Sequence, residues 1–141
     1  MVLDVSQLSE LNLAELNYLR EAIQATNIFF PSGKVVPGPE QAPVLDRLAG
    51  QIKEFADNAR KSGVTARFML TGHSDATGRE TANASISTAR AEAVRALLNK
   101  RGVAPELLLV RGAGTFEPLV PENSQAGSST NRRVSITVNL D

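Results

Sequence analysis

Asp75 and Arg90 are the residues of this chain whose types and positions best fit the recognition of a charged small group. The helical pattern around Arg90 otherwise carries a conventional apolar stripe of Ile86, Ala93 and Leu97. At about 100° per residue, Arg90 points about 40° away from Ile86, which predicts a place on or beside the inward face of the helix. A guanidinium at the margin of a core needs an anion, because leaving it unpaired costs several kcal/mol or more.

Asp75 lies in the turn directly after a predicted buried strand, the edge of an α/β sheet at which crevices form. An acid and a base facing each other across a cleft complement a zwitterion such as an amino-acid head group. Asn83 precedes Arg90 by about two turns, within about 20° of the same direction, so the two would line one side of the cleft. The spacing supports equally well a purely structural ion pair between Asp75 and Arg90.

His73 is the single histidine, and with Ser74 and Asp75 it raises the question of hydrolysis. Consecutive residues in a turn rarely aim at one substrate atom, so a hydrogen-bonded structural histidine is expected instead. One histidine without any cysteine leaves only carboxylates for a metal, so neither a metal site nor a cofactor is expected. Thr77 and Gly78 in the same turn are typical helix-entry residues.

Two adjacent arginines enter the last predicted strand. Alternation places Arg132 in phase with Val134 and Ile136 and turns Arg133 toward the opposite face, so Arg132 is the better candidate for ligand contact. Its alternative role is an arginine paired with a carboxylate at the rim of the sheet.

Three helices are predicted to position these residues. The first, residues 13–25, follows a capping-box pattern at Asn12 and Glu15 and is interpreted as a lead-in element. The second begins near Pro43 and ends at Gly63. Its expected core positions are Leu45, Leu48, Ile52, Phe55 and Ala59. The third spans residues 81–101 and is closed by Gly102.

Strands are predicted at residues 27–30, 66–71, 107–110 and 134–140. Strands alternating with helices indicate at least one parallel crossover, and the direct return into the last strand indicates a mixed sheet. The expected fold is an α/β two-layer sandwich in which two main helices cover a mixed four-stranded sheet, with an additional N-terminal helix.

Bulk composition narrows the function further. With 141 residues, 42% of them apolar, the chain suits a single core. The 15 basic and 15 acidic residues balance, which argues against a nucleic-acid partner. The first residues do not resemble a secretory leader, and no stretch is apolar enough for a membrane span. We therefore expect a cytosolic protein or an excised soluble piece of a longer one, without membrane insertion by this stretch.

Several segments, in this order, resemble the OmpA-like C-terminal domain family: GHSDATG, NASISTARAEAVRALLNKRGV, VRGAGTFEP and NRRVSITV. The resemblance runs from about Ile28 to the end of the chain. It implies a βαβαβ-β topology, with residues 1–26 as a lead-in helix and residues 27–141 as an OmpA-like peptidoglycan-binding domain. Members of this family bind peptidoglycan in the periplasm.

In that family the turn aspartate and the helix arginine hold the amino-acid end of diaminopimelate, and these positions fall on Asp75 and Arg90. The resemblance also assigns ligand contacts to Thr77, Asn83 and Arg132. The chain departs from the family pattern in having HSD for HTD, ISTARA for LSxxRA, and a serine, residue 128, in place of a loop arginine. The last change puts contacts from that loop in doubt.

The implied function is non-covalent binding of the peptidoglycan stem peptide, which would anchor a larger envelope protein to the wall without enzymatic activity. A homodimer is left open. Two rival functions are a wall-cleaving enzyme, for which the sequence offers no well-separated nucleophile and base, and a structural or signalling partner of another protein.

Overall fold

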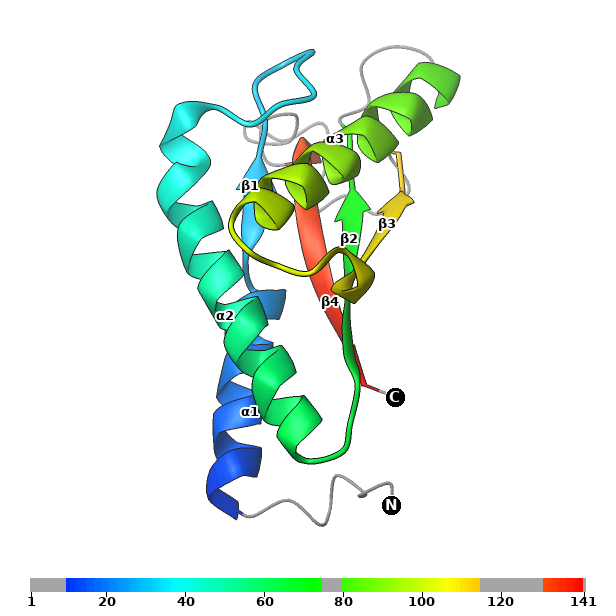
Figure 1. Ribbon diagram of the computed structural model, residues 1–141. Coiled ribbons are helices and arrows are strands. Elements are labelled where there is room, and N and C mark those ends of the chain that lie inside the picture. The colour runs from blue at the N-terminus through cyan, green and yellow to red at the C-terminus, as the bar shows by residue number, and fades with distance from the viewer. Residues whose placement is uncertain (1–9, 75–79, 115–130, 141) are drawn as a thin grey trace.

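One mixed sheet organises the molecule, with strands in the order β1-β4-β2-β3 (Figure 1). The computed structural model describes residues 10–74, 80–114 and 131–140. Its strands are β1 (Asn27–Phe29), β2 (Ala66–Gly72), β3 (Leu108–Gly112) and β4 (Arg133–Leu140). β2 and β3 are parallel, whereas β4 is antiparallel to both β1 and β2. The predicted mixed four-stranded sheet is confirmed.

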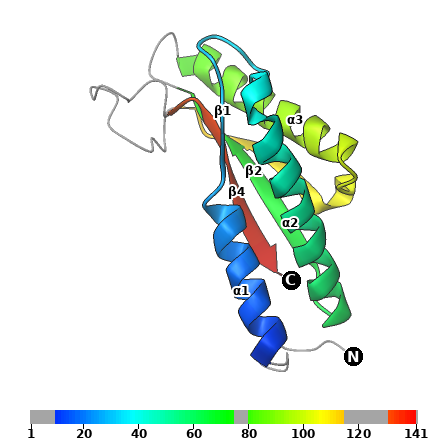
Figure 2. The same ribbon diagram turned by 90° about the vertical axis from the view of Figure 1, so that its left-hand side faces the viewer.

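Three helices pack with this sheet: α1 (Glu10–Gln24), α2 (Ala42–Lys61) and α3 (Glu80–Lys100). Single turns of 3₁₀ helix, Pro39–Gln41 and Pro105–Leu107, precede α2 and β3. α3 is the crossover between the parallel strands β2 and β3, and it lies on the same side of the sheet as α2 (Figure 2). α1 packs against α2 and β4. Among the described residues, none of the helices has the length and apolar content needed to cross a membrane.

Local signals placed most helix ends well. α2 has its proline in the first turn, and Gly63 and Gly102 adopt φ values of 76° and 90° just after α2 and α3. The capping box was wrong, because α1 begins at Glu10 and Asn12 therefore lies within the helix.

The core combines the predicted face of α2 with residues from every layer. All five predicted α2 positions are buried: Leu45, Leu48, Ile52, Phe55 and Ala59. Phe55 meets Phe68 of β2 edge to face, with ring centroids 5.9 Å apart. Leu16, Leu19 and Ile23 of α1 belong to the same cluster. The N-terminal helix therefore shares the core of the sandwich.

The inward face of α3 differs from the predicted one. Ile86, Ala93 and Leu97 are only half-buried. The buried face carries Asn83, Ser87, Arg90, Ala91, Val94 and Leu98. One reason is close packing: a side chain at Gly72 of β2 would overlap the backbone of Ser87, so α3 lies too near the sheet at this position for a large residue.

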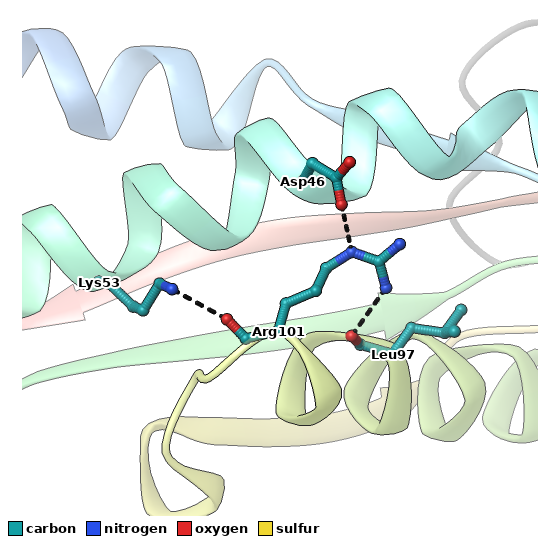
Figure 3. A network of polar contacts seen from close by, with 4 residues as sticks. All are labelled: Asp46, Lys53, Leu97 and Arg101. Atoms are coloured by element: carbon teal, nitrogen blue, oxygen red, sulfur yellow. Dashed lines mark hydrogen bonds and ion pairs between the residues drawn. The ribbon is translucent and has the colours of Figure 1, made fainter.

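Polar contacts fasten the C-terminal end of α3 to α2 (Figure 3). Arg101 Nε bonds Asp46 Oδ1 at 2.7 Å, while its Nη1 donates to the Leu97 carbonyl at 3.0 Å. Lys53 Nζ donates to the carbonyl of Arg101 at 2.9 Å. The bonds to the carbonyls of Leu97 and Arg101 satisfy acceptors that the end of a helix leaves without a partner. Together with the bond to Asp46, they attach the C-terminal end of α3 to α2.

Two carboxylates, Glu15 and Glu54, meet where α1 packs on α2. A hydrogen bond with Glu15, assisted by slight desolvation and by repulsion from Glu15, raises the pKa of Glu54 above its ordinary value of 4.5. The folded state therefore binds this proton more tightly than the unfolded state. The free energy of unfolding accordingly falls as pH rises from about the ordinary value through the raised pKa.

The substitution Glu54→Gln is expected to raise the free energy of unfolding at pH 7 by a few tenths of a kcal/mol, because it removes like-charge repulsion at an exposed site. Urea unfolding at pH 7 and pH 3 measures the effect. The gain should vanish at pH 3, where the wild-type carboxyl is already protonated. An equal gain at both pH values would contradict this explanation.

Candidate functional site

Arg90, in the middle of α3, is the most enclosed charged group of the described chain. Its side chain is 2% exposed. Nε donates to the Lys34 carbonyl at 2.9 Å and Nη1 to the His73 carbonyl at 3.1 Å. The guanidinium carbon lies 5.3 Å from the centre of the Phe30 ring, which suits a cation–π contact. The predicted inward position of Arg90 is confirmed.

These contacts join α3 to two other segments at one guanidinium. Phe30 and Lys34 lie in the stretch that follows β1, and His73 directly follows β2. The plane and direction of the Arg90 guanidinium are therefore set by groups far apart in the sequence. Arg90 is more enclosed than one wall of an open cleft, which was the sequence-based expectation, because Phe30 and the two carbonyl-bearing segments pack around it.

Asp75 and Thr77 lie outside the described residues. The described chain before them ends at Ser74, whose N–H donates to the Gly114 carbonyl at 2.9 Å. The N–H of Ala113 donates to the Gly72 carbonyl at 2.8 Å, so the parallel strands stay together just beyond their carboxyl ends. The residue before Asp75 is thus fixed at the edge of the sheet beside Arg90.

Ser74 was considered from the sequence only together with His73 and Asp75, as a question of hydrolysis. It is 4% exposed, and its hydroxyl has no hydrogen-bond partner in the described part of the chain. A buried hydroxyl without a partner costs about 1–3 kcal/mol and calls for an explanation in a native structure. Only burial reveals this residue, because a serine in a polar turn is otherwise unremarkable.

Asn83 occupies the same buried face of α3 as Arg90 and is 5% exposed. The helical spacing that placed these two residues on one side is confirmed. Ser87, which lies between them on that face, is fully buried and was not predicted. The missing signal is hydrophobicity, since a small polar residue contributes nothing to an apolar stripe.

His73 has the structural role expected from the sequence. Its Nε2 lies 2.9 Å from Ser135 Oγ of β4. Its N–H donates to the Arg133 carbonyl at 2.8 Å, and its own carbonyl receives Nη1 of Arg90. It therefore links the end of β2 to β4 and to α3. Within residues 10–74, 80–114 and 131–140 no group of three or more metal-ligating side chains comes together.

The two arginines at β4 have different surroundings. Arg132 is half-buried, and its Nε donates to the Phe30 carbonyl at 3.0 Å while its own carbonyl accepts the Phe30 N–H at 3.0 Å. Val134 and Ile136 are buried in the core, but Arg132 lies before the first residue of β4, so its predicted phase with them stays a prediction. Arg133 is the more buried of the pair, at 5% exposure, although it was set aside. Alternation predicts the face of a residue but not its depth.

Two solved structures share this architecture and define the class of the protein as an OmpA-like α/β domain. The peptidoglycan-associated lipoprotein from Burkholderia pseudomallei matches with a TM-score of 0.70 and 19% identity, over 96% of this chain and 100% of that one. The C-terminal domain of Helicobacter pylori MotB matches with a TM-score of 0.71 and 20% identity, over 82% of this chain and 85% of that one. At these identities the similarity concerns the fold.

The chain belongs to the OmpA family, whose family model matches residues 29–132. Among its relatives, the peptidoglycan-binding protein ArfA of Mycobacterium tuberculosis is 31% identical over 126 residues. That alignment covers 89% of this chain but 36% of ArfA, so the chain spans about a third of the length of this relative.

Proposed function

We propose that this chain binds peptidoglycan non-covalently and anchors a larger envelope protein to the cell wall in the periplasm, with residues 27–141 as the binding domain. Membership of the OmpA family supports the proposal. So do the names of two similar proteins, a peptidoglycan-binding protein and a peptidoglycan-associated lipoprotein. The proposed role is binding alone, with no bond of the wall broken.

The ligand group is the amino-acid end of diaminopimelate in the stem peptide, held between Asp75 and Arg90. The observation that carries this assignment is the position of Arg90, which bonds the carbonyl of His73, two residues before Asp75. A carboxylate on the loop would bind the ligand ammonium, and the guanidinium fork would clasp its carboxylate. Lysine-type stem peptides lack that carboxylate and should bind more weakly.

Thr77, Asn83 and Arg132 are the further contacts in this proposal. Asn83 shares the buried face of Arg90. Arg132 donates Nε to the carbonyl of Phe30, the residue whose ring lies against the Arg90 guanidinium, so the two arginines share a neighbour. Because Arg90 is 2% exposed, the proposal also requires the guanidinium to become accessible as the ligand enters.

Single-domain affinity should be modest. Each hydrogen bond to a charged group contributes on the order of 1.5–3 kcal/mol in a favourable site. Ordering a small flexible peptide opposes this gain. Firm anchoring would then arise from many domains meeting one polymeric wall, where effective concentration strengthens weak single contacts.

The direct test is co-sedimentation with insoluble peptidoglycan, combined with an NMR titration using diaminopimelate and lysine stem peptides. We expect the wild type to sediment with the wall and to bind the diaminopimelate peptide more tightly. Asp75→Asn should weaken wall binding and the binding of both peptides, because it removes the charge that faces the ammonium carried by each. Asp57→Asn is the matched control, since it makes the same change on the exposed surface of α2.

If Asp75→Asn sediments with the wall as completely as the wild type, the proposed pocket is refuted, although binding of the wall by the domain would stand. The rival functions give different outcomes. Release of muropeptides from purified sacculi would establish a wall-cleaving enzyme instead. Failure of the wild type to sediment would favour a protein partner.

A further inference from the structure

Ser87 makes a hydrogen-bonded bridge between α3 and the ends of the parallel strands. It is 0% exposed. Its hydroxyl donates to the Ala84 carbonyl at 2.8 Å and accepts the N–H of Gly114 at 3.0 Å. The carbonyl of Gly114 in turn accepts the N–H of Ser74 at 2.9 Å. A short chain of bonds thus runs from α3 to the residue that precedes Asp75.

The same region has the closest approach of helix and sheet. An added side chain at Gly72 would overlap the Ser87 carbonyl, and one at Gly112 would overlap Thr88 Oγ1 and lie 2.8 Å from Ser87 Oγ. Backbone and hydroxyl of Ser87 therefore both lie directly against the carboxyl ends of β2 and β3. Any change in this contact shifts α3 relative to those ends, because there is no spare volume to absorb it.

Arg90 follows Ser87 on the same buried face and bonds the carbonyl of His73. The segment His73–Ser74 is therefore held to α3 twice, directly by Arg90 and through Gly114 by Ser87. Two attachments define the position and the orientation of that segment, whereas one would define only a distance. The position of Ser74 relative to the Arg90 guanidinium depends on both attachments.

We propose that Ser87 is a positioning residue that sets the spacing between Arg90 and the His73–Ser74 segment at the end of β2, and through it the preference for a zwitterionic head group. This inference rests on the proposed function and deepens it. Recognition of an ammonium and a carboxylate on one carbon requires both protein charges at a defined separation. Weakening one hydrogen bond to a charged group changes a dissociation constant by about tenfold or more.

Thr88 supplies a matched control on the neighbouring position. Its Oγ1 donates to the same acceptor, the Ala84 carbonyl, at 3.1 Å, but Thr88 is exposed. Thr88→Ala and Ser87→Ala therefore each remove one hydroxyl bond to the same carbonyl within the helix. Only Ser87→Ala also removes the acceptor for the buried N–H of Gly114.

The experiment measures the dissociation constants of diaminopimelate and lysine stem peptides by NMR titration, at a temperature where every variant is fully folded. Ser87→Ala should weaken diaminopimelate binding by about tenfold or more while leaving the lysine peptide nearly unchanged. Thr88→Ala should change neither constant by more than about twofold. Ser87→Cys, which keeps a weak acceptor, should lie in between and serves if the alanine variant does not fold.

An unchanged ratio of the two constants in Ser87→Ala or Ser87→Cys would overturn the inference, because a purely stabilising serine alters the folded fraction and not the selectivity. If the wild type prefers the diaminopimelate peptide and the variants keep that preference, the inference alone fails. If the wild type binds neither peptide, the proposed function fails and this inference with it.

Discussion

Arg90→Ala is expected to lower the free energy of unfolding by about 2–4 kcal/mol and to abolish binding of the diaminopimelate peptide. The substitution leaves the carbonyls of His73 and Lys34 without their donors and removes the cation–π contact with Phe30. The loss of a buried charge offsets part of this cost, since its desolvation is no longer needed. Urea unfolding gives the stability, and NMR titration gives the binding.

Two further variants separate support of the fold from ligand contact. Arg90→Met fills most of the vacated space without charge or donors, so its stability should lie closer to that of the wild type. Its binding should nevertheless be lost as fully as in Arg90→Ala. Arg90→Lys keeps the charge, but after two carbonyls its three donors leave only one for a carboxylate, so the bidentate clasp is lost. Stable Arg90→Met protein that still discriminates between the two stem peptides would show that Arg90 only supports the fold.

Gly72→Ala should have the second large effect, a loss of about 1–3 kcal/mol or more in the free energy of unfolding. The added methyl group would overlap the backbone of Ser87, which belongs to a helix and cannot move alone. α3 would have to shift away from the end of β2 and would take Arg90 with it. Affinity for the diaminopimelate peptide should therefore fall together with stability.

Gly50→Ala is the matched control for this substitution. Gly50 lies within α2, and a side chain there would meet nothing within 4 Å. Alanine at this helical position should raise the free energy of unfolding by about 0.5–1 kcal/mol. Peptide binding should not change. Equal stability losses in the two glycine variants would mean that the contact between Gly72 and Ser87 does not govern the outcome.

α3 is held at two places along its length. Arg101 fastens its C-terminal turn to Asp46 of α2, at a partly exposed site where an ion pair contributes up to about 1 kcal/mol. Ser87 and Arg90 fasten its earlier part to the sheet through buried bonds, which are more costly to break. Substitutions near the carboxyl ends of β2 and β3 should therefore matter most for ligand binding.

Much of the fold was predictable from local patterns. The periodicity of α2 identified its buried face, because five apolar residues at helical spacing leave one orientation that avoids water. Pro43, Gly63 and Gly102 marked helix ends through their backbone preferences. The alternation in β4 identified which side chains face the helices. The inward direction of Arg90 also followed from spacing alone.

The sequence by itself thus determined the helices and strands, the inward face of α2 and membership of the OmpA family. Only the tertiary structure decided which face of α3 is fully buried, how deep Arg133 lies, and that Ser87 bridges α3 to Gly114. The physical reason is that periodicity reports the direction of a side chain within its own element. Depth and hydrogen-bond partners depend instead on how closely remote segments approach, and at α3 that distance is set by two glycines on neighbouring strands.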